Sequence, residues 1–468
     1  ERLAAAVYKQ GEAARAQGQL AEAIGHYQRV ATVAPQSPVR ATAQYDAAAA
    51  MLAQKDWDGA ARTLEDFRSR YPKNPLQDEV TGKLAVAYVE SGNWAQAAVE
   101  LEKLAGANKD PQLARAGLWQ AAEMYEKAGA RSPAARTYER YASQYPEPLD
   151  ASLEARYRLA RLAREDGNPS RELALMRDVQ RADRAAGRAR TDRTRYLGGM
   201  AALALARPVA DDYRKVALVE PLKRQLKLKK DKLELALKAY AAAADVGVAE
   251  VSTAATYQTA ELYRDFGKAL MTSQRPKGLN KDALEQYNVM LEEQAFPFEE
   301  KAIELHEVNA KRTANGIYDS SVRDSIVALG QLRPARYGKV EREERTVDAD
   351  RAAGRSAQAV VALEKAVQLS PQRADLANQL GLAYRTAGDF AGAKASYERS
   401  IALDASYGSA VLNLGILYDL YLWDGARALE LYDRYLQLEP SDEQVKRWIT
   451  DLRNRTTQKD AAQRKEQG

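Results

Sequence analysis

Hydrophobic and small residues recur along this chain at the spacing of amphipathic helices. The segment 380–403, LGLAYRTAGDFAGAKASYERSIAL, shows the pattern within one unit, whose informative residues are Gly381, Tyr384, Gly388, Ala393 and Tyr397. We interpret the segment as two antiparallel helices joined at Gly388, because glycine readily adopts the backbone conformation that follows a helix.

The same spacing recurs elsewhere as an alanine, a large residue four positions later and a proline twelve positions later. Ala23, Tyr27 and Pro35 are one example, and the seven anchor alanines are Ala23, Ala60, Ala97, Ala134, Ala359, Ala393 and Ala428. Two of them depart at the proline: that of Ala97 comes later, at Pro111, and Ala393 has Ala405 at this position. The first four are 37 residues apart, and the last three are 34 and 35 apart. A repeat of this length predicts stacked helical hairpins. The small anchor allows two helices to cross closely, and proline ends the second helix.

These units resemble the tetratricopeptide repeat, which has glycine and tyrosine on its first helix and alanine, an aromatic residue, alanine and proline on its second. Gly381, Tyr384, Ala393 and Tyr397 match this signature, as do Gly11, Ala23, Tyr27 and Pro35. The match departs at Ser400 and Ala405, which replace the usual alanine and proline. The first helix before Ala359, expected over 340–354, is degenerate. The resemblance implies a generic binding scaffold.

We therefore expect an all-α fold, a tetratricopeptide-type helical-hairpin solenoid with a non-repeat middle segment of long helices. Four domains are predicted. They are an amino-terminal array of about four to five units (1–187), a helical middle domain (188–340), a carboxy-terminal array of about three units (341–445) and a polar helical tail (446–468).

Apolar periodicity predicts four helices in the middle segment. They cover Val216 to Tyr240, Val251 to Leu270, a stretch around Leu284 to Leu291 that is broken or kinked near Pro297, and a stretch beginning after Asp319 as its N-cap. The stretch 275–280, RPKGLN, predicts a turn between two of them.

The middle segment also resembles large bacterial repeat proteins described as components of TonB-type systems. The resemblance rests on the stretch from VEPLKRQLKLKKDKLELALKAYAAAADVGVAEVSTAATYQTAELYRDFGKALMTSQRPKGL to EEQAFPFEEKAIELHEVNA. It implies a periplasmic protein that works with proton-driven complexes of the ExbB/ExbD/TonB class.

Composition narrows the class of function. The chain has 468 residues, 70 basic and 65 acidic, and its net charge of +5 implies no overall attraction to nucleic acid. The absence of cysteine excludes disulfides and cysteine-bound metals but leaves the compartment open. No apolar run is long enough for a membrane span. The start, ERLAAAVYKQ, leads us to expect a trimmed chain whose signal peptide or anchor has been removed, with membrane contact only through such an anchor or a partner.

Catalytic and metal-binding motifs are missing. The two histidines are His26 and His306, and the sequence HEVNA around His306 lacks the second histidine of a zinc pair. Phosphate-binding loops and the GxSxG nucleophile motif are also missing. We expect no enzyme activity, no catalytic or metal residues and no cofactor. Two basic runs, 181–195 and 222–232, could contact an anionic partner, but we favour solvated helix faces.

Partner binding is expected on the first helix of each hairpin, which lines the concave surface of such arrays. The residues 15 positions before the first four anchors are Tyr8, Tyr45, Gly82 and Trp119, and their charged neighbours are Glu12, Arg15, Glu123 and Glu126. The same count from Ala393 gives Asn378, which predicts a more polar carboxy-terminal groove. Alternatively, the three aromatic residues only pack between adjacent first helices.

We hypothesise a non-enzymatic scaffold that binds partner peptides in a bacterial cell-envelope complex, with a TonB/ExbB/ExbD-type system as the specific candidate. It would reside in the periplasm. The alternatives are a cytoplasmic co-chaperone or regulatory adaptor and a cell-wall-associated assembly factor. Neither the partner's identity nor the oligomeric state follows from the sequence.

Overall fold

The computed structural model describes residues 1–342 and 356–466 and contains only helices, turns and loops over these ranges. This confirms the predicted all-α fold. The chain forms two compact units, Glu1–Ala201 and Ala202–Gly468. The finer division at 187, 340 and 445 stays a prediction.

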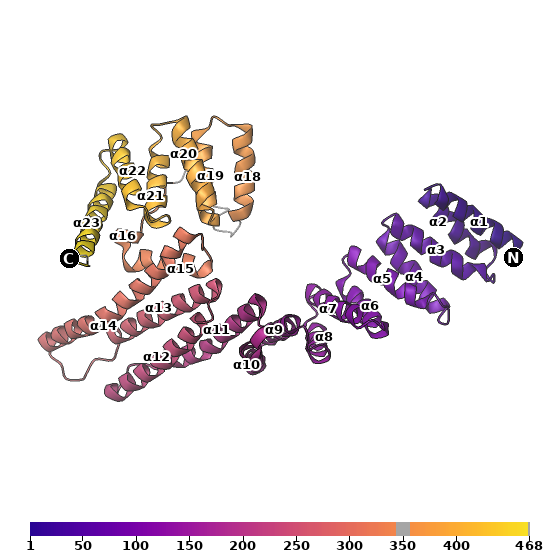
Figure 1. Cartoon of the computed structure of the whole chain (residues 1–468), viewed down its shortest axis with the longest axis horizontal. Helices are drawn as coiled ribbons and strands as arrows, with labels where there is room; N and C mark the ends of the chain where they lie inside the picture. The colour runs from indigo at the N-terminus through magenta and orange to yellow at the C-terminus, as the bar shows by residue number, and fades with distance from the viewer. Residues whose placement is uncertain (343–355, 467–468) are drawn as a thin grey trace. The chain divides into compact units, whose positions relative to one another are not determined.

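Unit 1 consists of five successive helical hairpins (Figure 1). Their helices are α1 (Arg2–Ala16) and α2 (Leu20–Val33), α3 (Val39–Ala53) and α4 (Trp57–Arg70), α5 (Gln77–Glu90) and α6 (Trp94–Ala107), α7 (Pro111–Lys127) and α8 (Arg131–Gln144), and α9 (Leu149–Glu165) and α10 (Pro169–Ala185). Each helix packs against the next, and the first helices of neighbouring hairpins also touch, α1 with α3 and α3 with α5. A short helix, η1 (Gly187–Ala189), follows α10.

The repeated residues have the packing roles that their spacing predicts. Six of the seven anchor alanines are completely buried, and Ala359 is half-buried. The glycine turn predicted at Gly388 has a positive φ angle, and so do the turns at Gly18, Gly92 and Gly129. Helices α2, α4 and α8 end two residues before their prolines, at Val33, Arg70 and Gln144. These features stabilise each hairpin locally, and stacking then buries a continuous core.

Unit 2 begins with long helices. They are the second part of α11 (Asp192–Arg214), α12 (Leu222–Ala244), α13 (Ala249–Met271) and α14 (Lys281–Ala310). The predicted helix from Val216 to Tyr240 is wrong in its first part, because Val216 and Val219 lie in the loop before α12. Pro221 immediately precedes α12, which suits the start of a helix because the first backbone N–H groups need no helical partner.

The predicted helix around Leu284 to Leu291 is not broken near Pro297, because α14 continues through this residue as one helix. The alternative, a kink at this proline, stays a prediction. Proline has no backbone N–H, so the carbonyl of Glu293, four residues earlier, loses its helical hydrogen bond. Glu293 is an exposed residue. Helix α14 packs against α13, and directly after the proline the rings of Phe298 and Phe266 lie 4.5 Å apart. The predictions for α13, for the turn at 275–280 and for Asp319 as an N-cap are confirmed.

The rest of unit 2 contains shorter helices. They are η2 (Lys311–Asn315), α15 (Ser320–Leu332), α16 (Pro334–Tyr337), α18 (Ser356–Leu369), α19 (Ala374–Ala387), α20 (Phe390–Leu403), α21 (Gly408–Leu420), α22 (Gly425–Leu438) and α23 (Glu443–Glu466). One core joins residues of α14 to α16 with residues of α19 to α23. The degenerate first helix expected over 340–354 lies mostly outside the described residues, and its described part, 340–342, is not helical.

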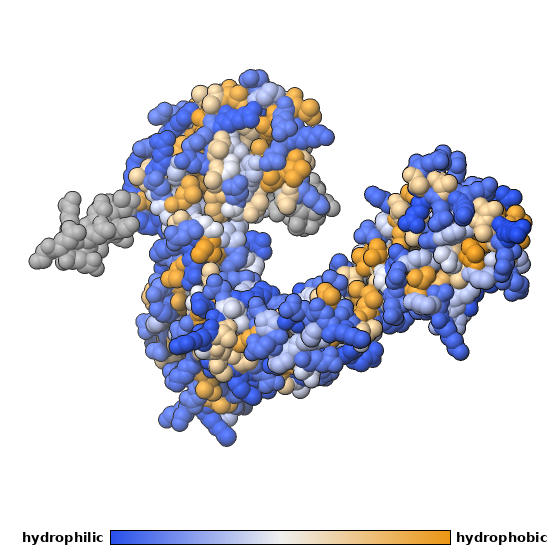
Figure 2. All heavy atoms as spheres, turned by 45° about the vertical axis from the view of Figure 1, so that its right-hand side comes forward, coloured by the Kyte–Doolittle hydropathy of each residue, from blue (hydrophilic) through white to orange (hydrophobic). Residues whose placement is uncertain are grey.

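The surface carries no broad apolar band on the face that Figure 2 shows, where hydrophobic residues form small separate groups within a mainly hydrophilic surface. Within the described ranges, no helix is both long and apolar enough to span a bilayer.

Candidate functional site

Three aromatic residues on first helices connect neighbouring hairpins in unit 1. The Tyr8 hydroxyl on α1 donates a hydrogen bond to Asp46 Oδ2 on α3 at 2.6 Å, and the Tyr45 hydroxyl donates to Glu79 on α5. The Trp119 ring on α7 lies 5.0 Å from the Arg158 guanidinium on α9. We call Tyr8, Tyr45 and Trp119, together with Gly82 at the equivalent position of α5, the first-helix ladder.

The rings of the first-helix ladder also pack against second helices. Tyr8 lies 5.5 Å from the Tyr27 ring, and Tyr45 lies 6.1 Å from the Phe67 ring. Trp119 makes edge-on contacts with the rings of Tyr138 and Tyr141, at 5.5 and 5.1 Å. All three aromatic residues are therefore half-buried and stabilise the stack, while part of each side chain remains accessible.

Gly82 is the open position in the first-helix ladder. A β-carbon added there would meet no atom within 4 Å. The adjacent Lys83 extends its Nζ to 5.3 Å from the Tyr45 ring. The third hairpin therefore leaves free space at the position where its neighbours carry large rings.

The charged neighbours that the sequence singled out differ in exposure. Glu12 and Arg15 are exposed, and the Arg15 guanidinium lies 3.6 Å from Asp46. Glu123 and Glu126 on α7 are half-buried and both pair with Arg158, at 3.2 and 3.0 Å. The structure therefore places these four residues in two groups, one around Asp46 and one around Arg158.

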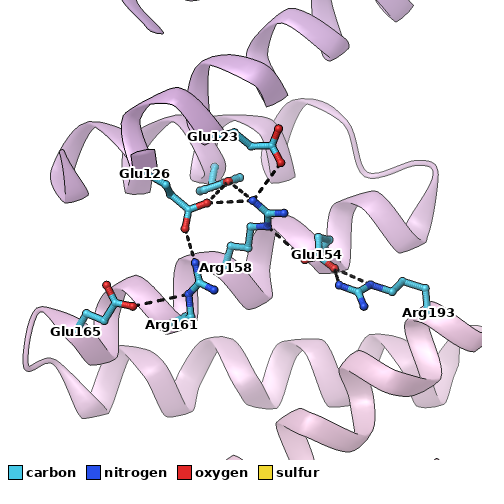
Figure 3. A network of polar contacts seen from close by, with 8 residues as sticks. Glu123, Glu126, Glu154, Arg158, Arg161, Glu165 and Arg193 are labelled. Atoms are coloured by element: carbon cyan, nitrogen blue, oxygen red, sulfur yellow. Dashed lines mark hydrogen bonds and ion pairs between the residues drawn. The ribbon is translucent and has the colours of Figure 1, made fainter. Parts of the chain in front are cut away.

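Arg158 is the centre of a polar network that joins α7, α8 and α9 (Figure 3). Its guanidinium donates to the Tyr138 hydroxyl at 2.9 Å, and that hydroxyl donates to Glu126 at 2.5 Å. Burial and the hydrogen bond to Glu126 raise the pKa of Tyr138. Burial lowers the pKa of Arg158, but Tyr138 and its carboxylate partners raise it by more, so this arginine stays charged.

The network extends along α9 to the start of α11. Arg161 pairs with Glu126 at 2.5 Å, and Arg193 donates to Glu154 at 2.8 Å, while Glu154 also pairs with Arg158 (Figure 3). Sequence reasoning missed Arg158 because it lies on the fifth hairpin, beyond the regularly spaced anchors. Its position 39 residues after Trp119, close to the repeat length, was the available signal.

Asn378, predicted to line a polar carboxy-terminal groove, is 1% exposed. Its Oδ1 accepts a hydrogen bond from Asn413 Nδ2 at 3.1 Å. Asn413 in turn bonds the backbone of Arg342, accepting from its N–H at 2.8 Å and donating to its carbonyl at 3.0 Å. Asn378 thus orients Asn413, which sequence reasoning missed although it stands 15 residues before the anchor Ala428.

The other sequence candidates take part in internal contacts. His306 is buried between α14 and α13, with its Nε2 3.2 Å from Glu261. In the basic run 181–195, Arg190 pairs with Asp183 at 2.8 Å, and in the run 222–232 the buried Lys229 donates to the Val216 carbonyl at 2.9 Å. No group of three or more His, Asp or Glu residues in the described ranges could hold a metal ion.

Three family models match the sequence. Residues 1–127 match the YfiO family, described as an outer membrane lipoprotein, and residues 116–148 and 378–443 match tetratricopeptide repeat models. Tetratricopeptide repeats are therefore present in both units, which confirms the prediction from residue spacing. A search of curated proteins found no match.

Several solved structures match this chain at low similarity. The structure of Naa15/Naa10 bound to HypK-THB is 16% identical, with 97% of this chain covered and a TM-score of 0.36, and this chain spans 61% of that one. A tetratricopeptide repeat protein from Parabacteroides merdae is 11% identical, with 62% and 99% of the two chains covered and a TM-score of 0.26. The P58(IPK) TPR domain is 11% identical, with 97% and 99% covered and a TM-score of 0.22.

Proposed function

We propose that this protein is a non-enzymatic scaffold of the bacterial cell envelope that holds peptide segments of partner proteins along the first-helix ladder. One observation carries the proposal: the gap at Gly82 lies within the part of the chain that matches an outer membrane lipoprotein family. A row of half-buried aromatic residues with an open position suits a ligand side chain, because aromatic residues with polar edges are favoured anchors at binding surfaces.

The chemistry of the ladder supports a peptide as its ligand. Hydroxyls and carboxylates alternate along it, in the pairs Tyr8–Asp46 and Tyr45–Glu79, and Arg15 and Lys83 add positive charge beside them. Such a surface offers hydrogen bonds to a peptide backbone and ion pairs to its side chains. A repeat array presents these groups in register along an extended segment.

The finer assignment concerns compartment and partner. We place the protein in the periplasm and regard subunits of a TonB/ExbB/ExbD-type complex as its partner class. The family match at 1–127 supports the envelope location, and the resemblance of the middle segment supports the partner class. Fractionation of cells that express the complete gene tests the location, and recovery in the cytoplasmic fraction would favour a regulatory adaptor instead.

Site-specific photocrosslinking tests the binding surface. A benzophenone amino acid at position 82 should crosslink to an envelope protein in living cells, because a side chain there points into open space. The matched control is position 99, since Val99 is exposed on α6, the second helix of the same hairpin. Equal crosslinking at both positions, or none at position 82, would contradict the proposal.

A further inference from the structure

The segment Gly338–Arg342, which follows α16, crosses a face formed by the carboxy-terminal repeats. This segment is not helical, and its side chains alternate between buried and exposed positions. The Lys339 side chain is completely buried, Val340 is 76% exposed, and Glu341 is buried again. Alternation of this kind is the pattern of an extended peptide lying on a surface.

Lys339 is held by groups from three helices. Its ammonium pairs with the buried Asp419 on α21. It also lies 5.2 Å from the rings of Tyr432 on α22 and Trp448 on α23. A carboxylate and two aromatic faces bind a cation specifically, because the charge would otherwise lose its hydration without compensation.

Glu341 lies in a second pocket, which favours a negative charge where the pocket around Lys339 favours a positive one. Its carboxylate pairs with Arg385 on α19 and accepts a hydrogen bond from the Tyr397 hydroxyl on α20 at 3.0 Å. The two pockets therefore select a basic residue and, two positions later, an acidic residue.

The backbone of the segment is bound independently of its sequence. Asn413 makes its two hydrogen bonds to the N–H and the carbonyl of Arg342, as described above. The Arg342 side chain adds an ion pair to Asp442 at 2.5 Å. Hydrogen bonds to the backbone, combined with pockets for alternate side chains, are the usual means of recognising an extended peptide. We call Arg385, Asn413, Asp419, Tyr432 and Trp448 the Asn413 face.

We propose that the Asn413 face is a second peptide-binding site, that residues 339–342 occupy it in cis, and that a partner peptide with the pattern basic–any–acidic replaces them. Release of the segment leaves each charged receptor group with at least one other contact. Asp419 retains Arg455 at 3.5 Å, and the Arg385 guanidinium lies 5.7 Å from the Tyr421 ring. Both groups also regain water once the segment has left. This site lies in unit 2 and is independent of the ladder in unit 1.

Peptide binding to an opened variant of the full chain tests the proposal. The probe is a fluorescent peptide GKVER, the sequence of residues 338–342, and the variant combines Lys339→Ser with Glu341→Ser. Weakening the bound segment should tighten probe binding about tenfold or more relative to the parent, because a closed site lowers apparent affinity by the fraction that is open. Adding Asn413→Ala should abolish the gain. A folded, opened variant that binds no better than the parent would overturn the proposal.

A second measurement keeps the test decisive if the opened variant does not fold. The chain has no cysteine, so Val340→Cys provides a single site for a nitroxide label on an outward-facing residue. Millimolar GKVER peptide should increase the mobility of the label, since a tethered segment competes at an effective concentration of about this order. The control peptide GEVKR has the same composition with the charges exchanged and should have no effect. Unchanged label mobility with GKVER would show that the segment is a fixed structural connection.

Discussion

The ring of Tyr27 on α2 occupies the space beside Gly11 on α1, where an added β-carbon would lie 2.6 Å from the ring. The same relationship joins Gly415 and Tyr432, at 2.8 Å. The glycine of the first helix therefore makes room for the aromatic residue that follows the anchor alanine. This contact explains why the repeat pairs these two residue types.

Gly11→Ala should destabilise unit 1 because the new methyl group must displace the Tyr27 ring. Overpacking of this kind costs about 1–3 kcal/mol, partly offset by the better helix propensity of alanine. Gly25→Ala on α2 is the control, because a β-carbon there meets no atom within 4 Å, and it should stabilise the helix by about 0.5–1 kcal/mol. Urea denaturation measures both. Equal effects of the two substitutions would refute the packing role of Gly11.

Glu100 should make the stability of unit 1 depend on acid pH. Arg68 donates two hydrogen bonds to its buried carboxylate, at 2.8 and 2.5 Å. Burial raises the pKa of Glu100, but the bonds from Arg68 and Lys103 lower it by more, so the folded pKa lies below the unfolded value of 4.5. The ion pair thus contributes stability above about pH 4.5, and this contribution is lost as pH falls through the folded pKa.

Glu100→Gln should therefore lower the unfolding free energy by about 1–3 kcal/mol at pH 7 and by clearly less at pH 3. Denaturation curves at the two pH values measure the difference. Glu285→Gln, at an exposed residue of α14, is the control and should change little at either pH. If Glu100→Gln lowered the unfolding free energy equally at both pH values, the shape of the Glu100 side chain, and not its charge, would determine the role of this residue.

Arg158→Lys should destabilise the stack of α7, α8 and α9, because a single ammonium cannot replace a guanidinium that bonds Tyr138 and three carboxylates. We expect a loss of about 1–3 kcal/mol. Arg161→Lys is the control, because it removes the same chemical group from a more exposed side chain. The exposed fraction of the side chain is 53% for Arg161 and 26% for Arg158. The control should cost less than about 1 kcal/mol of stability, as is usual for surface ion pairs. Thermal denaturation that ranks the two variants in the opposite order would contradict the central role of Arg158.

Gly82→Trp should block partner binding at the first-helix ladder without unfolding the protein, because the new side chain fills open space. Crosslinking of the partner from another exposed first-helix position, such as residue 12 on α1, should fall at least several-fold, while the melting temperature changes by only a few degrees. Val99→Trp on the other helix of the hairpin is the control and should leave crosslinking unchanged. Full crosslinking in the Gly82→Trp variant would exclude the ladder as the binding site.

Sequence spacing was a good guide where contacts are local and repeated, and a poor guide elsewhere. The anchor alanines and the prolines act within one hairpin, so their roles could be predicted from distances of a few residues. Val216 and Val219 matched a helical face by periodicity, yet they lie in the loop before α12. Periodicity alone could not show that the chain changes direction before Pro221.

The helical hairpins, their turns and the positions of the ladder residues could be predicted from the amino-acid sequence, because each depends on side-chain size and backbone preference at fixed spacing. Which polar groups meet could be seen only in the folded chain. Arg158 joins three helices, Asn413 reaches the backbone of Arg342 from 71 residues away, and Lys339 meets Asp419 across 80 residues. Such pairings depend on how the chain returns to its own surface, since buried charges are stable only where the fold brings opposite charges together.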